Sequence, residues 1–426
     1  MRIFTFILLF IYIYSPFLKI SGEILKLPIL IQFLFLIIGT PSCIWMVKKY
    51  LIFRHMIYMI SGALLVYLIL FYYHGGLDAT GIKLLIFGVT SAFGAAYFCC
   101  KYQKLYKSNY SSKLIIHIFF IGILHAIIIL LELTSYGLWM QDIFVYSDKS
   151  LQTWDYRPSG LLYSGFGALS ISQAMTGFFG LILIFLTPKY YYNDREVIYI
   201  STGILIIVSS IICTGRVGLI IFILSLPIFF TINLLIFYKN INKLVVLFFT
   251  FLIGLFAIQF FSDYDAGQYS KILVWSFELY YRFTSTGEIG TGSTDILFNQ
   301  MFFIPESIAD IWFGTGNFGV TPINLETDVG YVQEIFGGGI VGLVSILSIF
   351  LYFFYISIIN LFCSPIISNC LLFSTILLTL SNFKDPSFFN IYGSNQIIFI
   401  IFSLLAMKNT YGHVIDKRGS IYLDNR

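Results

Sequence analysis

The sequence predicts an all-α polytopic integral membrane protein of about 12 transmembrane helices, and three observations lead to this fold class. First, 58% of the 426 residues are hydrophobic and only 11% are charged, whereas soluble domains carry about 25% charged residues. Second, apolar runs of about 20 residues, long enough to cross the hydrocarbon of a bilayer, recur along the chain. Third, the polar residues are concentrated in two long connections. This composition excludes a soluble globular protein, a disordered chain and a disulfide scaffold.

We expect the apolar stretches to be helices of one bundle that comprises residues 1–426. Backbone groups in lipid must pair within their own segment, and these stretches are too long and too uniformly apolar for barrel strands. The first stretch follows Arg2 and lacks a small-residue cleavage site, so we expect a retained anchor and not a signal peptide. The stretches lie near residues 3–20, 27–47, 52–73, 82–100, 114–133, 162–186, 196–213, 216–237, 243–261, 333–358, 365–383 and 391–407.

Lysine and arginine set the orientation of the bundle. If the N-terminus is cytoplasmic, most of the 25 cationic residues lie at the inner ends of the spans and most of the 21 acids lie at the outer ends. Both termini are therefore expected in the cytoplasm. The formal net charge of +4 is what remains when the inner positive charges and the outer negative charges are added together. It gives no indication of nucleic-acid binding.

Two outer connections are long, about residues 134–161 and 262–332, whereas the inner connections are short. Loops of this length beside a compact bundle are usually functional or disordered. The second is rich in aromatic and acidic residues, so we expect it to fold as a subdomain over the outer helix ends. Its apolar stretches 272–283 and 296–303 are expected to be short interfacial helices.

Three arginines lie on the outer side, against the orientation bias: Arg157 in Arg157-Pro158-Ser159-Gly160, Arg216 in Thr214-Gly215-Arg216-Val217-Gly218, and Arg282 in the second loop. Arg216 lies at the lip of a tight hairpin between two predicted spans, where a guanidinium is costly unless it is paired or hydrated. One interpretation is a snorkelling side chain that anchors the interface. We favour an anion site, because the planar guanidinium binds phosphate through two parallel hydrogen bonds.

The second outer loop ends in an acidic segment that leads into the span near 333–358. Glu326 and Asp328 lie in this segment, and Tyr331 falls on the same side of a helix as Asp328. Asp328 is well suited to cap the N-terminus of the helix. Beside a cluster of arginines, its carboxylate could instead act as a general base on a hydroxyl.

Small and polar residues within the spans indicate close helix contacts. Gly338 and Gly342 form a pair that lets a neighbouring helix or a lipid chain come close. The span near 162–186 begins with many Gly, Ala and Ser residues, which suits tight packing or a groove for a thin apolar chain, and we favour packing. For His117 and His125, which share one span, we favour interhelical hydrogen bonds.

The sequence gives little support for a cofactor. Asp263 and Asp265 have the D-x-D spacing of metal-dependent sugar transferases, but two acids at a helix end are common. Neither long outer loop contains a His, and no P-loop, serine elbow or zinc signature is present. We therefore expect no metal and no other cofactor.

These features together resemble the bacterial O-antigen polymerases, which form one superfamily of polytopic sugar transferases with the O-antigen ligases. The resemblance covers nearly the whole chain in topology. Its motifs are Arg157-x-x-Gly160 at the end of the first outer loop, Gly215-Arg216 at the outer lip of a mid-chain hairpin, and Asp328-x-Gly330-Tyr331 followed by a Gly-x-x-Gly that enters the next helix.

The resemblance implies an enzyme of the bacterial inner membrane that acts at the periplasmic face. An oligosaccharide leaves undecaprenyl pyrophosphate and is joined to a hydroxyl of the next lipid-linked repeat unit, so that an O-antigen or capsule-type polysaccharide grows. The implied partners are these lipid-linked oligosaccharides, membrane lipid and a chain-length regulator membrane protein. The implied residue roles are pyrophosphate binding by Arg157, Arg216 and Arg282, general-base catalysis by Asp328 or Glu326, and substrate binding by Tyr331, Gly160 and Gly215.

Two other functions remain open at this point. A ligase-type transferase of the same superfamily would be expected to have a His near the position of Asp328, and this sequence has none there. A flippase or another transporter would place ionisable groups at mid-membrane. Because the polar residues here are concentrated in the outer loops, the sequence favours a polymerase.

Overall fold

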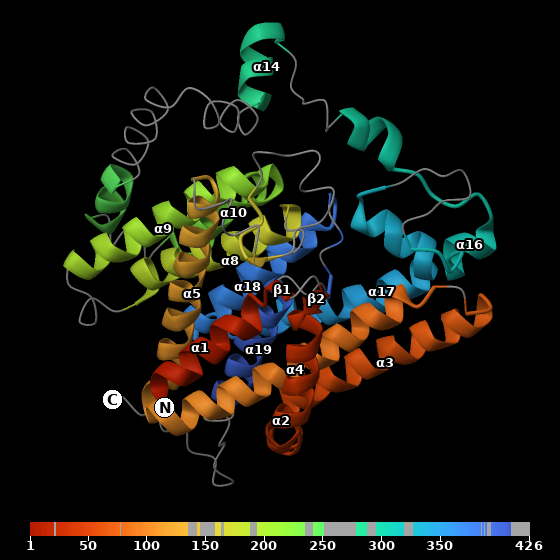
Figure 1. Ribbon diagram of the computed structural model, residues 1–426, viewed down its shortest axis with the longest axis horizontal. Coiled ribbons are helices and arrows are strands. Elements are labelled where there is room, and N and C mark those ends of the chain that lie inside the picture. The colour runs from red at the N-terminus through yellow and green to blue at the C-terminus, as the bar shows by residue number, and fades with distance from the viewer. Residues whose placement is uncertain are drawn as a thin grey trace.

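The computed structural model describes residues 1–20, 23–76, 78–134, 143–144, 158–162, 166–187, 194–234, 242–250, 278–287, 295–318, 327–384, 386, 388–389 and 393–409, and Figure 1 shows their arrangement. Within this part of the chain, 6 helical segments are long and apolar enough to cross a membrane, namely Leu27–Lys49, Leu51–Tyr73, Thr80–Glu132, Gly167–Leu186, Arg195–Thr214 and Gly330–Ile359. The protein is therefore a helical, multi-pass membrane protein.

The bundle helices follow one another with short connections where both ends are described. Their bounds are α1 (Arg2–Ile13), α2 (Leu27–Lys49), α3 (Leu51–Tyr73), α4 (Thr80–Tyr106), α5 (Tyr110–Glu132), α8 (Phe166–Leu186), α9 (Asp194–Thr214), α10 (Arg216–Ile232), α17 (Gly330–Ile359), α18 (Pro365–Ser381) and α19 (Ser394–Asn409). Lys107, with a φ of 49°, interrupts the long segment between α4 and α5.

Every predicted span overlaps a helix among the described residues, but the first one needs correction. The sequence predicted a span over residues 3–20, whereas α1 ends at Ile13 and strands β1 (Phe17–Ile20) and β2 (Glu23–Lys26) form an antiparallel hairpin. Pro16 explains this end, because proline has no N–H for the helix and disfavours helical geometry in the residue before it. The 12 residues of α1 rise only about 18 Å, which is less than the hydrocarbon thickness.

Helix α8 lies at the centre of the bundle, with α10 and α18 beside it in Figure 1. Every residue in the most apolar part of this helix, within Gly167–Leu186, is buried. The small residues of α8 receive neighbouring side chains: a Cβ at Gly180 would lie 2.6 Å from atoms of Ile204 and Phe119. The same close approach brings Gly122 of α5 onto Thr176 of α8. The small face is filled by other helices, which confirms the packing interpretation.

Helix α17 is broken at Gly339, whose φ of 64° and ψ of −169° are not helical. A Cβ at this position would lie 2.3 Å from the carbonyl oxygen of Trp312. At the break, the carbonyl oxygen of Phe336 accepts hydrogen bonds from another segment. Thr315 donates to it through its N–H (2.6 Å) and through its hydroxyl (3.0 Å). Such irregular backbone is tolerated at membrane depth because protein covers it.

Helix α17 packs against α3. Ring atoms of Tyr67 lie 3.1 Å from a Cβ built on Gly338, and its hydroxyl lies 2.8 Å from one built on Gly342. The two glycines therefore admit a neighbouring helix, as their spacing predicted.

The second outer loop contributes three helices among the described residues: α14 (Glu278–Thr286), η3, a π-helix (Leu297–Met301), and α16 (Ile308–Phe313). Figure 1 shows α14 at the top of the view and α16 at its right edge. Helices α14 and η3 overlap the interfacial helices predicted over 272–283 and 296–303, although residues 272–277 lie outside the described part.

Candidate functional site

The turn between α9 and α10 is fixed on α8. Gly215 caps α10 in an extended conformation (φ −170°), so that Arg216 is the first residue of the helix. The N–H of Gly218 donates to Ser170 Oγ at 3.1 Å, and a Cβ at Gly218 would lie 2.6 Å from the backbone oxygen of Ser170. Only glycine allows this approach, which holds Arg216 at the end of the helix that the sequence predicts to face outward.

Arg216 forms an ion pair with Glu278, the first residue of α14. The Arg216 side chain is 16% exposed and that of Glu278 is 36% exposed. One turn further along α14, Arg282 pairs with Asp295, whose Oδ2 lies 2.7 Å from the guanidinium. Residues four apart on a helix are neighbours on one face. Helix α14 thus links two of the three predicted arginines, Arg216 through its partner Glu278 and Arg282 directly.

The end of the first outer loop is docked on α5. Gly160 has a φ of 59°, and Leu162 N–H closes the turn onto Ser159 O at 3.1 Å. The N–H of Gly160 donates to Glu132 Oε2 at 2.7 Å, and the N–H of Leu161 donates to His125 Nε2 at 3.3 Å. The sequence pattern that begins with Arg157 therefore ends in a turn held by two acceptors on one face of α5. Arg157 itself lies outside the described residues.

His125 connects this turn to α8, which confirms the interhelical role predicted for it. Because Nε2 accepts from Leu161, a neutral imidazole has its hydrogen on Nδ1. The amide nitrogen of Gln173 lies 2.9 Å from Nδ1, while the amide oxygen is buried without a partner among the described residues. Turning the amide by 180° places Oε1 against the Nδ1 hydrogen and satisfies both groups. His117 makes a similar interhelical hydrogen bond, in which its Nδ1 lies 2.7 Å from the hydroxyl oxygen of Tyr102 on α4.

The two glycine turns thus converge on the same part of α8. The Gly215 turn reaches it through Ser170, and the Gly160 turn reaches it through His125 and Gln173. Ser170 and Gln173 are neighbours on one helical face. Two segments that the sequence identified separately are brought to one end of the bundle.

The predicted catalytic carboxylates lie at another element. Asp328 is exposed just before α17, and Glu326 lies outside the described residues. Val329, and not Asp328, is the N-cap of α17, so the capping interpretation of Asp328 is wrong. Thr327 provides the local hydrogen bonds instead: its Oγ1 accepts from Val329 N–H at 3.1 Å, and its carbonyl accepts from Gln333 Nε2 at 2.6 Å.

Tyr331, in the first turn of α17, faces α18 and the segment that follows it. Its hydroxyl donates to Thr379 O at 2.8 Å, and its ring makes edge contacts with Phe383 and Phe388. Its position therefore holds the start of α17 against the end of α18.

A buried carboxyl to which the sequence analysis assigned no role lies one turn further along α17. Glu334 is 4% exposed and accepts a hydrogen bond of 2.6 Å from the hydroxyl of Tyr67 on α3. An acid at the start of a predicted span is the signal that could have identified it, because ionisable groups at membrane depth are rare and usually functional.

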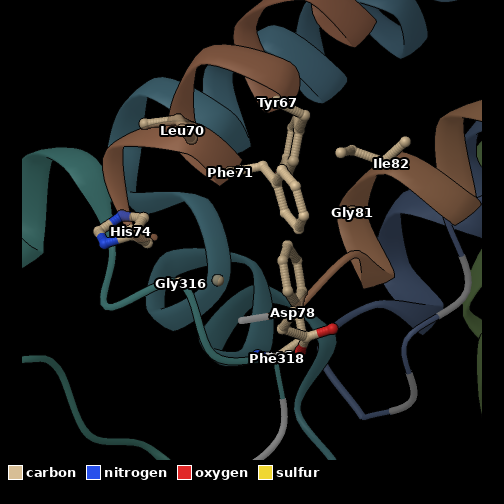
Figure 2. Close-up of a pocket in the computed structure, with 10 residues that line it drawn as sticks. Tyr67, Leu70, Phe71, His74, Asp78, Gly81, Ile82, Gly316 and Phe318 are labelled. Carbon is tan, nitrogen blue, oxygen red and sulfur yellow. Dashed lines mark hydrogen bonds between the residues drawn. The ribbon is translucent and has the colours of Figure 1, made fainter. Parts of the chain in front are cut away.

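Figure 2 shows the pocket beside this pair, between α3, α4 and the segment after α16. The rings of Tyr67, Phe71 and Phe318 point toward one another across it. At its rim, Asp78 Oδ2 accepts from Phe318 N–H at 3.0 Å, and His74 Nε2 lies 2.9 Å from Phe313 O. These contacts fasten the end of the second outer loop to the α3–α4 connection.

Within the described residues, no group of three or more His, Cys, Asp or Glu side chains is placed to hold a metal ion. The candidates Asp263 and Asp265 lie outside them. The described groups that could take part in chemistry are two arginines paired with carboxylates, the exposed Asp328 and the aromatic rings of the pocket.

No protein-family model matches this chain, and no curated protein matches it.

Proposed function

We propose that the protein polymerises lipid-linked oligosaccharides, as the bacterial O-antigen polymerases do, at the periplasmic face of the inner membrane. An oligosaccharide bound to undecaprenyl pyrophosphate is transferred to a hydroxyl of the next lipid-linked unit, and undecaprenyl pyrophosphate leaves. The proposal includes twelve spans, cytoplasmic termini and a periplasmic subdomain over residues 262–332.

The observation that carries this proposal is the link between Arg216 and Arg282 through α14. A leaving pyrophosphate needs fixed positive charge, and two guanidinium groups near one helix can supply it without a metal. The Arg216–Glu278 and Arg282–Asp295 ion pairs connect both guanidinium groups to α14, which supports the proposal.

The docking of both glycine turns on α8 supports the same proposal. Gly160 follows Arg157 by three residues, and Gly215 precedes Arg216. Ser170 receives the Gly215 turn directly, and Gln173 holds the Gly160 turn through His125, so the two turns are anchored on one face of α8.

Asp328 is the proposed general base for the acceptor hydroxyl. It is exposed at the start of α17 and is not the capping residue of that helix. Its carboxylate is thus open to an acceptor from the outer side. Glu326 is the second candidate for this role.

The test is the size of the surface polysaccharide made by a bacterial strain that lacks this chain and is complemented with variants. Arg216→Ala and Arg282→Ala should reduce the long ladder to single repeat units on their acceptor, because loss of one preorganised donor lowers turnover about 100-fold to 1,000-fold. Asp328→Asn should shorten the chains similarly. The matched control is Arg195→Ala, which removes an exposed arginine at the opposite end of α9 and should leave the ladder long.

The alternatives give different results in the same gel. If even the single repeat unit is missing from its acceptor in the deletion strain, the protein acts as a flippase or a ligase. An unchanged ladder in the Arg216→Ala and Arg282→Ala strains would contradict the pyrophosphate site.

A further inference from the structure

Positive charge is concentrated at the end of the bundle opposite the Gly160 turn, where α2 and α4 end and α3 and α5 begin. Residues 24–131 contain a single acid, Asp78, which lies in the α3–α4 connection at the other end. The ends of α1 to α5 carry eight cations here, and within the described residues none of the eight forms a salt bridge. They are Arg2, Lys48, Lys49, Arg54, Lys101, Lys104, Lys107 and Lys113.

Helices α2 and α4 run side by side in the same direction. A Cβ built on Gly39 of α2 would lie 2.5 Å from the backbone oxygen of Phe93 on α4. Further along both helices, Ser42 lies beside Cys100. The last turn of α2 therefore reaches the last turns of α4, and lysines of both helices meet at this end. A general excess of cations on the cytoplasmic side would not require this convergence.

Lys49 and Lys104 are the two lysines that this packing brings together. Both lie within electrostatic range of Cys100, Lys49 from α2 and Lys104 from the next turn of α4. The Nζ of Lys49 lies 4.7 Å from the centroid of the Trp45 ring, which keeps the ammonium group beside α2. Like charges held near each other repel, so an anion between them is stabilised. We refer to Lys48, Lys49, Lys101 and Lys104 as the α2–α4 lysine cluster.

An exposed apolar stripe on α2 leads directly to this cluster. Phe33, Ile37 and Ile44 recur at helical spacing and are 55%, 72% and 50% exposed. The stripe continues through Trp45 to Lys48, so apolar surface and positive charge share one face of the helix. In a membrane protein such a face contacts lipid, and Trp is typical of the level at which the headgroups begin. A ligand that matches the whole face has acyl chains and an anionic headgroup.

We propose that the α2–α4 lysine cluster binds the phosphodiester headgroup of an acidic membrane phospholipid, whose acyl chains lie along the exposed stripe of α2. An ammonium group binds phosphate as a compact point charge, and two of them from neighbouring helices can contact one headgroup. A soluble acidic partner would match the lysines but not the stripe. The inference does not depend on the proposed polymerase activity, because the cluster lies at the opposite end of the bundle from the outer arginines.

The experiment measures lipid binding to the full chain by native mass spectrometry. Phosphatidylglycerol and phosphatidylcholine with identical acyl chains are titrated separately, and phosphatidylglycerol should have the lower Kd. The double variant Lys49→Gln/Lys104→Gln should raise that Kd about 30-fold, because each lysine at a membrane surface favours anionic lipid about 5-fold. The matched control is Lys26→Gln/Lys83→Gln, which removes exposed lysines at the opposite ends of the same two helices and should leave the Kd unchanged.

A charge-conserving variant separates loss of the site from loss of the fold. Lys49→Arg/Lys104→Arg keeps both cations, so it should bind phosphatidylglycerol within about 2-fold of the original Kd. Equal Kd values for the two lipids, or an equal loss of affinity in the control pair, would overturn the proposal.

Two competitors distinguish the lipid from soluble anions. Neither glycerol 3-phosphate, which has the phosphate without acyl chains, nor a poly-glutamate peptide should displace phosphatidylglycerol. Displacement by glycerol 3-phosphate would show that the stripe contributes nothing and would refute a lipid site. Displacement by the peptide would assign the cluster to an acidic protein segment instead.

Discussion

The turn at Gly160 offers a quantitative test of how the first outer loop is held on the bundle. Gly160 has a φ of 59°, and a Cβ there would lie 2.8 Å from His125 Nε2 and 2.9 Å from Ile129. Alanine in a left-handed conformation costs about 1–2 kcal/mol. Forcing an extra carbon into a packed site costs about 1–3 kcal/mol more. Gly160→Ala should therefore lower the free energy of unfolding by about 2–5 kcal/mol.

Two other glycines separate these contributions. Gly287 has a φ of 74°, but no atom of the described residues lies within 4 Å of where its Cβ would be, so Gly287→Ala should show the conformational cost alone. Gly62 lies inside α3 with the same open space and no positive φ, so Gly62→Ala should not destabilise the protein. The order of stability should be Gly62→Ala, then Gly287→Ala, then Gly160→Ala.

Thermal unfolding in detergent can be followed with a thiol-reactive dye, because Cys43, Cys99 and Cys370 are free and buried in the folded protein. The dye reacts as these thiols become exposed, and the midpoint gives the rank order. If Gly160→Ala unfolds at the same temperature as Gly287→Ala, the close contact with His125 and Ile129 is not made, and the docking of this turn on α5 is wrong.

Two further predictions concern α17. Tyr67→Phe should destabilise the protein by about 1–3 kcal/mol, because the buried Glu334 loses the hydroxyl that donates to it; Tyr58→Phe, on an exposed position of the same α3, should have no effect in the same unfolding assay. Gly339→Ala should cost about 2–5 kcal/mol, because its φ is 64° and its Cβ would lie 2.3 Å from Trp312 O. Gly75→Ala, with a φ of 71° but open space around the Cβ, is its control, and equal losses in the two variants would contradict the contact between α16 and the break.

Most of the helical fold could be predicted because hydropathy alone determines it. Apolar runs of membrane-spanning length have no stable alternative to a helix in lipid, so each predicted stretch overlaps helical residues, although the stretch 243–261 is described only as far as residue 250. The wrong end of the first predicted span, over residues 14–20, comes from features that hydropathy does not measure. Those residues are apolar enough to extend the run, but Pro16 ends α1 locally, and pairing of Phe17 with Lys26 starts a hairpin that hydropathy does not reveal.

The break in α17 could not be predicted from composition. Its glycines signalled a close approach, and Gly338 and Gly342 do contact Tyr67. The break itself depends on Thr315, because that residue satisfies the carbonyl of Phe336. Such a partner lies in a different segment, and its pairing is a tertiary contact that no local pattern indicates.

The candidate site was predictable in its residue types and not in its partners. Arginines against the orientation bias pointed to Arg216 and Arg282, and the structure links them through α14. The sequence did not indicate that Glu278 would join them, since acids are frequent throughout the outer loops. Nor did it indicate that Glu334 would be buried against Tyr67, which follows from the packing of α3 on α17.

The most direct test of the proposed polymerase is a reconstituted reaction. The purified full chain is placed in liposomes with undecaprenyl-pyrophosphate-linked repeat units, and chain length and released undecaprenyl pyrophosphate are measured together. We predict that the saccharide lengthens by whole repeat units, with one undecaprenyl pyrophosphate released per unit added, and that Arg216→Ala loses both. Repeat units that cross the bilayer without growing in length would contradict the proposed function.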